Sequence, residues 1–111
     1  MLQQADYLLQ QGYKNPAASL CGAVLEDGLR RIAAMRGVKT KPDDDLNALS
    51  HRCAQANVYS SLVLKKVQVW IATRNKADHG QFNEYSDVDV LDMLNGVQTF
   101  LADHALERGT Q

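Results

Sequence analysis

Apolar residues recur three and four positions apart along most of the chain, and this spacing limits the fold to one built from helices. The two clearest stripes are Ala17, Leu20, Cys21, Val24, Leu25, Leu29, Ile32 and Ala33, and then Val90, Met93, Leu94, Val97, Phe100 and Leu101. Residues at these intervals share one face of an α-helix, whereas a half-buried strand alternates apolar and polar residues. The pattern therefore predicts an all-α fold without strands.

Capping residues and helix breakers divide this pattern into five predicted helices. They are expected at about residues 2–11, from Asn15 and Pro16 to just before Gly37, at about 45–57, from Ser60–Ser61 to Asp78 or His79, and from Ser86 onward. Asn15 is the predicted N-cap of the second helix and Pro16 its first residue, while Gly12, Gly37 and Gly80 are predicted stops. Because the connections are short, we expect a single antiparallel bundle over residues 1–111.

Composition favours one intracellular domain. The chain has 111 residues and a formal net charge of -1, which excludes a polycation that binds long nucleic acids through bulk charge. Its two cysteines, Cys21 and Cys53, lack metal-ligand spacing and lie in apolar helical patterns, as reduced core thiols do. With no signal peptide or membrane span in the sequence, we expect a soluble, cytoplasmic protein. The helical pattern begins almost at Met1 without a cap, which suggests a domain of a longer protein.

Two features have a structural interpretation. Gly22 and Gly28 lie inside the second predicted helix, where each costs about 1 kcal/mol relative to alanine, so we expect a neighbouring helix to approach closely there. The acidic run Asp43-Asp44-Asp45 precedes the third helix, whose positive end it would complement. Nothing nearby has the spacing of an acidic metal loop, and we expect neither a metal nor a cofactor.

The fourth predicted helix is apolar on more than one side. Its main stripe of Val63, Val67, Trp70 and Ile71 continues by one turn onto Arg74 and Asn75, and Leu62, Leu64 and Val69 lie off that stripe. An arginine exposed to solvent would sit away from the core stripe. One bundle core covers one side of a helix, and a second copy of the chain could cover another. The pattern therefore favours a homodimer.

The segment Arg74-Asn75-Lys76-Ala77-Asp78-His79-Gly80 carries the candidate chemistry. Asn75 and His79 are four residues apart and face the same way on a helix, and a left-handed turn at Gly80 would let Arg74 join them. A guanidinium binds phosphate oxygens and an imidazole transfers protons near neutral pH, so the three suit phosphodiester cleavage. The same residues also fit a structural interpretation, in which Arg74 pairs with Asp78 and His79 interacts with the negative helix end.

This segment resembles the RxxxxH signature of the HEPN superfamily, in which a polar residue, often asparagine, follows the arginine. The stretch YKNPAASLCGAVLEDGLRRIA also resembles the second helix of bacterial HEPN-like domains of defence and toxin systems. The resemblance covers nearly the whole chain. In one respect it departs: HEPN toxins paired with nucleotidyltransferase antitoxins often have a tyrosine two residues after the histidine, where this chain has Gln81.

The resemblance implies a metal-independent endoribonuclease in which two copies of the motif face each other across a homodimer. His79 would then act as general base or acid, Arg74 would hold the scissile phosphate, and Asn75 would position one of them. RNA would be the substrate, a cyclic phosphate the product, and a cognate antitoxin or an attached domain a further partner. The alternative within the family is a non-catalytic dimerisation or nucleotide-binding or RNA-binding module of a larger protein. A helical interaction domain unrelated to RNA is a third hypothesis.

Overall fold

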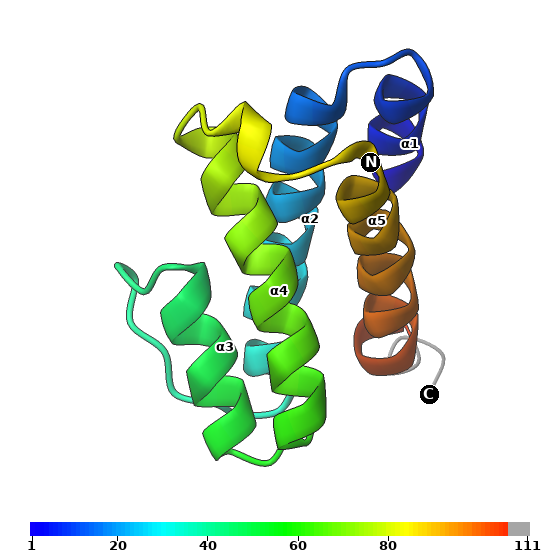
Figure 1. The fold of residues 1–111 in the computed structure, drawn as a ribbon. Helices are drawn as coiled ribbons and strands as arrows, with labels where there is room; N and C mark the ends of the chain where they lie inside the picture. Colours follow the sequence, from blue (N-terminus) through cyan, green and yellow to red (C-terminus); the bar gives the residue numbers. More distant parts are fainter. Residues whose placement is uncertain (107–111) are drawn as a thin grey trace.

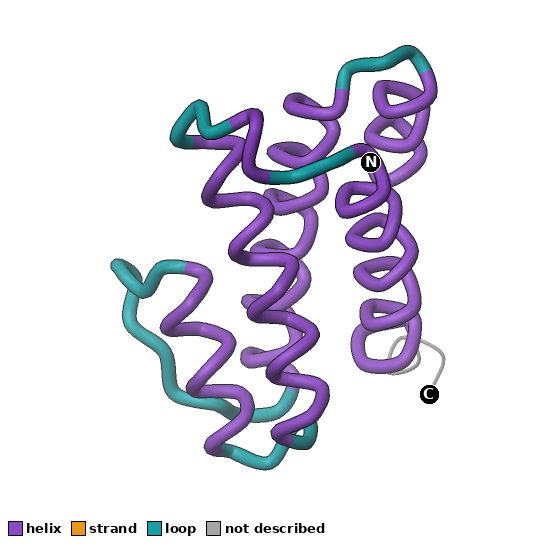
Figure 2. Tube along the Cα trace, in the orientation of Figure 1, coloured by secondary structure: helices purple, strands orange, loops and turns teal. Residues whose placement is uncertain are grey.

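Five α-helices and no strand make up residues 1–106, the part of the chain that the computed structural model describes. The helices are α1 (Leu2–Gln10), α2 (Lys14–Met35), α3 (Leu46–Gln55), α4 (Ser61–Asp78) and α5 (Asp87–Leu101). A 3-10 turn, η1 (Phe82–Glu84), lies between α4 and α5, and a π-helical turn, η2 (Ala102–Leu106), follows α5. The all-α prediction is confirmed (Figures 1 and 2).

The 22-residue α2 is the central helix, because it contacts each of the other four α-helices. In Figure 1, α1 and α5 lie to the right of α2, and α3 and α4 lie to its left. The buried side chains that α2 contributes to the core include Cys21, Leu25, Leu29 and Ile32, all on the stripe that the sequence predicts. No helix among residues 1–106 is both long and apolar enough to cross a membrane.

Most helix ends follow the local sequence signals. The Ser60 hydroxyl accepts a hydrogen bond from the N–H of Val63 at 3.2 Å and so begins α4. At the start of α5, Ser86 and Asp89 form a reciprocal capping box. The predicted stops Gly12, Gly37 and Gly80 all adopt positive φ angles, of 88°, 69° and 73°. These boundary predictions are confirmed.

The predicted start of the second helix is wrong. α2 begins at Lys14 with Tyr13 as its N-cap residue, so Asn15 and Pro16 both lie within the first turn. Instead of capping the helix, the Asn15 side-chain oxygen accepts a hydrogen bond from the hydroxyl of Tyr85, across the bundle. A proline is tolerated in the first turn because the N–H it lacks would have no acceptor within the helix.

Two aspartates of the acidic run stabilise the fold, and Asp45 does so at the start of the third helix, as the sequence predicts. Asp45 caps α3 by accepting the N–H of Ala48 at 2.8 Å. Asp44 is buried, accepts the N–H of Lys41 at 2.8 Å and pairs with Arg52 at 2.7 Å. No group of three or more histidine, cysteine or acidic side chains within the described residues could hold a metal ion. These contacts fix the loop between α2 and α3 to the body of the bundle.

Candidate functional site

The candidate site lies where α4 ends. His79 is the C-cap residue of α4, and its N–H donates to the carbonyl of Asn75 at 3.0 Å. At Gly80 the backbone turns into the left-handed region, and the N–H of Gln81 donates to the carbonyl of Lys76 at 2.8 Å. This arrangement satisfies the last carbonyls of the helix. It leaves the His79 side chain exposed at the helix end.

Arg74 is held against α2 because residue 22 has no side chain. A Cβ atom on Gly22 would overlap the Cγ of Arg74 and would lie 2.9 Å from its Cβ. The aliphatic part of the arginine therefore crosses the surface of α2 at this glycine, and its side chain is only 17% exposed. The close approach predicted at Gly22 is confirmed, as is that at Gly28, which lies against Leu101. The geometry fixes the path of the Arg74 side chain.

Three side chains surround the Arg74 guanidinium. Its Nε donates to the side-chain oxygen of Asn75 at 3.0 Å and lies 3.5 Å from a carboxylate oxygen of Asp78. Its Nη1 lies 3.6 Å from a carboxylate oxygen of Glu26, on α2. Both ion-pair distances exceed the roughly 2.7–2.9 Å of a short charge-assisted hydrogen bond. The cation is thus oriented by acidic neighbours without being locked in a bidentate pair.

The two acidic neighbours are themselves held in place. Ser19 on α2 donates its hydroxyl proton to Asp78 at 2.7 Å, and Arg30 donates to Glu26 at 3.1 Å. Arg30 also donates to the backbone carbonyl of Asp44 at 2.8 Å. A line of polar contacts therefore runs from the start of α2, past Arg74, to the loop before α3.

The loop that follows His79 is fastened to the first turn of α2. Lys14 donates to the carbonyls of Phe82 and Tyr85, at 2.8 and 2.6 Å, and its Nζ lies 4.6 Å from the centre of the Tyr85 ring. Desolvation by burial, followed by the nearby charge of Asp78, raises the pKa of the Tyr85 phenol. These contacts hold the chain on the far side of Gly80 and so limit where His79 can lie.

Of the predicted trio, two members meet. Arg74 and Asn75 are joined by a hydrogen bond, whereas the His79 side chain forms no hydrogen bond or ion pair with any residue in the described range. The ion pair between Arg74 and Asp78, the structural interpretation of this spacing, is present. A single copy of the chain therefore assembles part of the trio and leaves the imidazole accessible.

Sequence reasoning left out Glu26 and Ser19, which shape the surroundings of Arg74. A signal for Glu26 existed in retrospect, since it lies four residues after Gly22 and on the same face of α2. The spacing of Glu26 and Arg30 also fits an ion pair in solvent. In the structure Glu26 contacts both Arg30 and Arg74, and the contact with Arg74 depends on the packing of α4 against α2.

The other reactive side chains have structural roles. Cys21 and Cys53 are free, buried thiols, and burial raises the pKa of Cys21 to about 12 and also raises that of Cys53. The His104 ring packs against Phe100 and Tyr59, with ring centres 4.8 and 6.0 Å apart. His51 lies 3.2 Å from the side-chain amide of Gln68. The cysteines are confirmed as buried core thiols, and the end of α4 remains the best candidate site.

Comparisons with known proteins add no relative: no family model, curated protein or solved structure matches this chain.

Proposed function

We propose that this chain is a metal-independent endoribonuclease of the HEPN type, acting as a homodimer in a toxin–antitoxin or phage-defence setting. The observation that carries the proposal is the fixed arginine. Arg74 lies across Gly22 with its guanidinium beside Asn75, and His79 stands exposed at the end of the same helix. A positioned cation and an accessible imidazole are the groups that phosphodiester cleavage needs.

The proposed reaction uses a nucleophile of the substrate. His79 of one copy takes the proton of a ribose 2′-hydroxyl, and the 2′-oxygen attacks the adjacent phosphorus. The bond to the 5′-oxygen breaks, and that oxygen takes a proton from the His79 of the second copy. Arg74 stabilises the charge that develops on the phosphate oxygens, and Asn75 keeps the guanidinium oriented. The products are a 2′,3′-cyclic phosphate and a 5′-hydroxyl.

An RNA phosphate would compete with the two carboxylates for Arg74. The ion pairs with Glu26 and Asp78, at 3.6 and 3.5 Å, are longer than short charge-assisted hydrogen bonds, and their carboxylates are 33% and 45% exposed, so a phosphate can compete with them. A phosphate accepting two short hydrogen bonds from the guanidinium offsets their loss. The carboxylates then serve to orient Arg74 before the substrate arrives.

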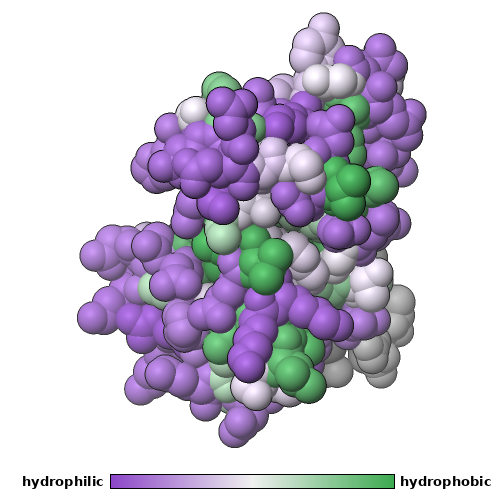
Figure 3. All heavy atoms as spheres, viewed as in Figure 1, coloured by the Kyte–Doolittle hydropathy of each residue, from purple (hydrophilic) through white to green (hydrophobic). Residues whose placement is uncertain are grey.

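The outer face of α4 supports the homodimer. Leu62 and Val69 are 69% and 63% exposed and lie seven residues apart, so they share one side of the helix. Ala72 and His79 are also exposed and seven residues apart, and they lie beside Val69 on the same side of the helix. In Figure 3 hydrophobic atoms emerge over α4. A second copy whose α4 ran parallel to this one would bury the apolar side chains and bring the two His79 residues toward a common cleft. Lys65 and Lys76 lie on the same side of α4, so their charged ends would have to lie at the edge of the interface.

One observation favours the alternative of a non-catalytic dimerisation or nucleotide-binding module. The Arg74 guanidinium already contacts two carboxylates and an amide oxygen. An arginine whose only role is to connect α4 with α2 would have the same contacts. The two functions share the fold and the dimer. They differ in whether bound RNA is cleaved.

The test is cleavage of a mixed RNA pool in the presence of EDTA. We expect cleavage by the wild-type chain and its loss, by at least about 100-fold, in His79→Ala and Arg74→Ala. Arg31→Ala is the matched control, since Arg31 is an exposed arginine of α2 paired with Asp27. RNA bound but intact with all four proteins would support the non-catalytic module. Equal cleavage by all four would assign the activity to a contaminant and contradict the proposal.

A further inference from the structure

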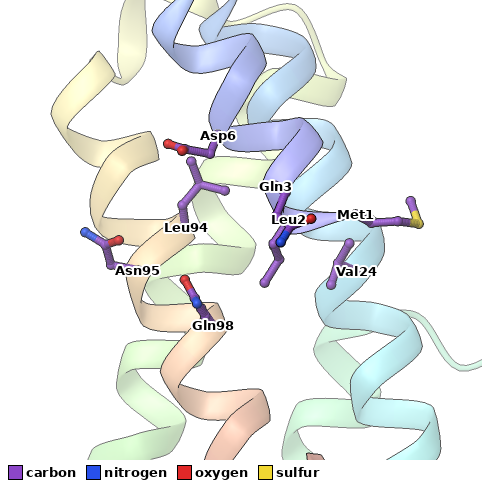
Figure 4. Close-up of a pocket in the computed structure, with 8 residues that line it drawn as sticks. All are labelled: Met1, Leu2, Gln3, Asp6, Val24, Leu94, Asn95 and Gln98. Carbon is purple, nitrogen blue, oxygen red and sulfur yellow. The ribbon is translucent and has the colours of Figure 1, made fainter.

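The side of the bundle opposite α4 carries a long groove between α1 and α5. One hollow of about 660 Å³ lies between α1, α2 and α5, and a second of about 400 Å³ continues it toward the start of α5. Both are lined by Asp6. Figure 4 looks into the first hollow, with Leu2 and Gln3 from α1, Val24 from α2 and Gln98 from α5 around it.

The groove follows one face of α5 over three turns. Its lining on this helix comprises Asp87, Val88, Leu91, Leu94, Asn95 and Gln98, which share one side of a helix. At a rise of about 1.5 Å per residue the groove is about 16 Å long on this helix. That length matches about three turns of a second helix laid along it.

Apolar side chains line the end of the groove near the start of α5, and two of them are exposed. Val88 is 64% exposed and Leu91 44%, although both belong to a helix whose other apolar residues form the core. In Figure 3 hydrophobic atoms are visible over the start of α5. The larger hollow has a mainly polar lining, to which the amides of Gln3, Asn95 and Gln98 contribute. A groove that offers exposed apolar side chains beside polar ones can bind a helix that has an apolar face and a polar edge.

The negative charge of α1 and α5 favours a positively charged partner. α1 and α5 contain four aspartates (Asp6, Asp87, Asp89 and Asp92) and neither lysine nor arginine. Asp6 and Asp87 line the groove itself. In contrast, α4 contains three lysines and one arginine against a single aspartate. The acidic face repels nucleic acid and anionic lipid, and it would also repel the same face of a second copy.

We therefore infer that the α1–α5 groove binds a cationic amphipathic helix of a partner protein. Leucine-like residues of that helix, spaced three and four apart, would pack against Val88 and Leu91. Its lysines or arginines would face Asp6 and Asp87, and the amides of Asn95 and Gln98 would bond its polar edge. This inference is independent of RNA cleavage, because it uses the opposite side of the bundle.

A designed peptide tests the inference without a known partner. The probe is a fluorescent peptide of about 14 residues with leucines at helical anchor positions, lysines at the flanks and alanine elsewhere. Its counterpart has glutamate at every lysine position. We expect the lysine peptide to bind at least about tenfold more tightly than the glutamate peptide in fluorescence anisotropy, and to shift amide resonances of α1 and α5.

Two variants and a matched control locate the binding. Leu91→Lys and Val88→Lys each remove an apolar contact and add a repelling charge, so each should weaken the lysine peptide by at least about tenfold. Met35→Lys is the control, because Met35 is 48% exposed, close to the 44% of Leu91, and ends α2 outside the groove. Circular dichroism verifies that each variant is folded.

Three results would overturn the inference. The first is equal affinity for the two peptides or no binding of either. The second is a set of shifted resonances on α4 instead of α1 and α5. The third is a Leu91→Lys variant that binds the peptide normally but loses self-association, which would make the groove a contact between copies of this chain.

Discussion

The side chain of Arg74 lies directly against the α-carbon of Gly22, so the approach of α4 to α2 and the position of the candidate catalytic cation depend on the same glycine. The glycine lowers the helix propensity of α2. Because it has no side chain, Gly22 leaves room for Arg74, whose side chain is 17% exposed and whose guanidinium lies beside Asn75 and Asp78.

Gly22→Ala should therefore displace Arg74 and destabilise the fold. Overpacking costs about 1–3 kcal/mol and alanine regains about 1 kcal/mol of helix propensity, which leaves a net loss of about 1 kcal/mol in urea unfolding. RNA cleavage should fall with it. In the control Gly28→Ala, the new methyl meets Leu101 chiefly at the flexible end of its side chain, so cleavage should persist. A Gly22→Ala chain more stable than wild type and fully active would refute this account.

The exposed face of α4 should govern self-association. Val69→Lys introduces a charge on a face that a dimer would bury, so the variant should sediment as a monomer and lose RNA cleavage. Met35→Lys, which also replaces an exposed apolar residue, should leave both unchanged. Analytical ultracentrifugation measures the assembly state. If the wild type is itself monomeric at concentrations at which it cleaves RNA, the composite site is wrong.

Asp44 should make the stability of the chain depend on pH. Its pKa is lowered chiefly because the carboxylate accepts the N–H of Lys41, and further because it binds Arg52. The stability that such a group contributes is present above its unfolded pKa, near about 3.9, and is lost as the pH falls through the lower folded value. Asp44→Asn should thus unfold more easily than wild type at pH 7, with the gap shrinking at pH 3. A gap of equal size at both values in urea unfolding would contradict this.

The two thiols should be unreactive until the chain unfolds. Burial raises the pKa of Cys21 to about 12, and that of Cys53 is raised for the same reason, so little thiolate forms at pH 8. A thiol reagent should label neither residue in the folded chain and both in urea. Rapid labelling of Cys21 under native conditions would show that the core opens there more readily than its burial indicates.

Local signals in the sequence predicted the fold well because they act within one helix. Ser60 and Ser86 accept hydrogen bonds from backbone N–H groups three residues on, and the glycine stops turn their own backbone. The positions of both kinds of signal were predicted correctly. Asn15 was assigned wrongly because its amide has a competing partner, Tyr85, that is 70 residues away in the sequence. The spacing of residues within one helix cannot predict a hydrogen bond to a residue so far away in the sequence.

The candidate site could be predicted only in part for the same reason. The contact between Arg74 and Asn75 and the turn at Gly80 are local, and so is the pairing of Arg74 with Asp78. Glu26 and Ser19 reach the site from α2, and their contribution depends on how α2 and α4 pack. The apolar stripe showed that the helices meet without giving their relative position along the axis.

The most direct test of the central claim uses a short RNA oligonucleotide and the same strand with a single 2′-deoxy residue at the cleavage position, each incubated with the wild-type chain in EDTA. Mass spectrometry of the products identifies the new ends. We predict that the RNA is cut to a 2′,3′-cyclic phosphate and a 5′-hydroxyl, that the deoxy-substituted strand stays intact at that position, and that His79→Ala cuts neither. Cleavage of the deoxy-substituted strand at that position, or a product without the cyclic phosphate, would contradict a mechanism in which His79 activates the 2′-hydroxyl.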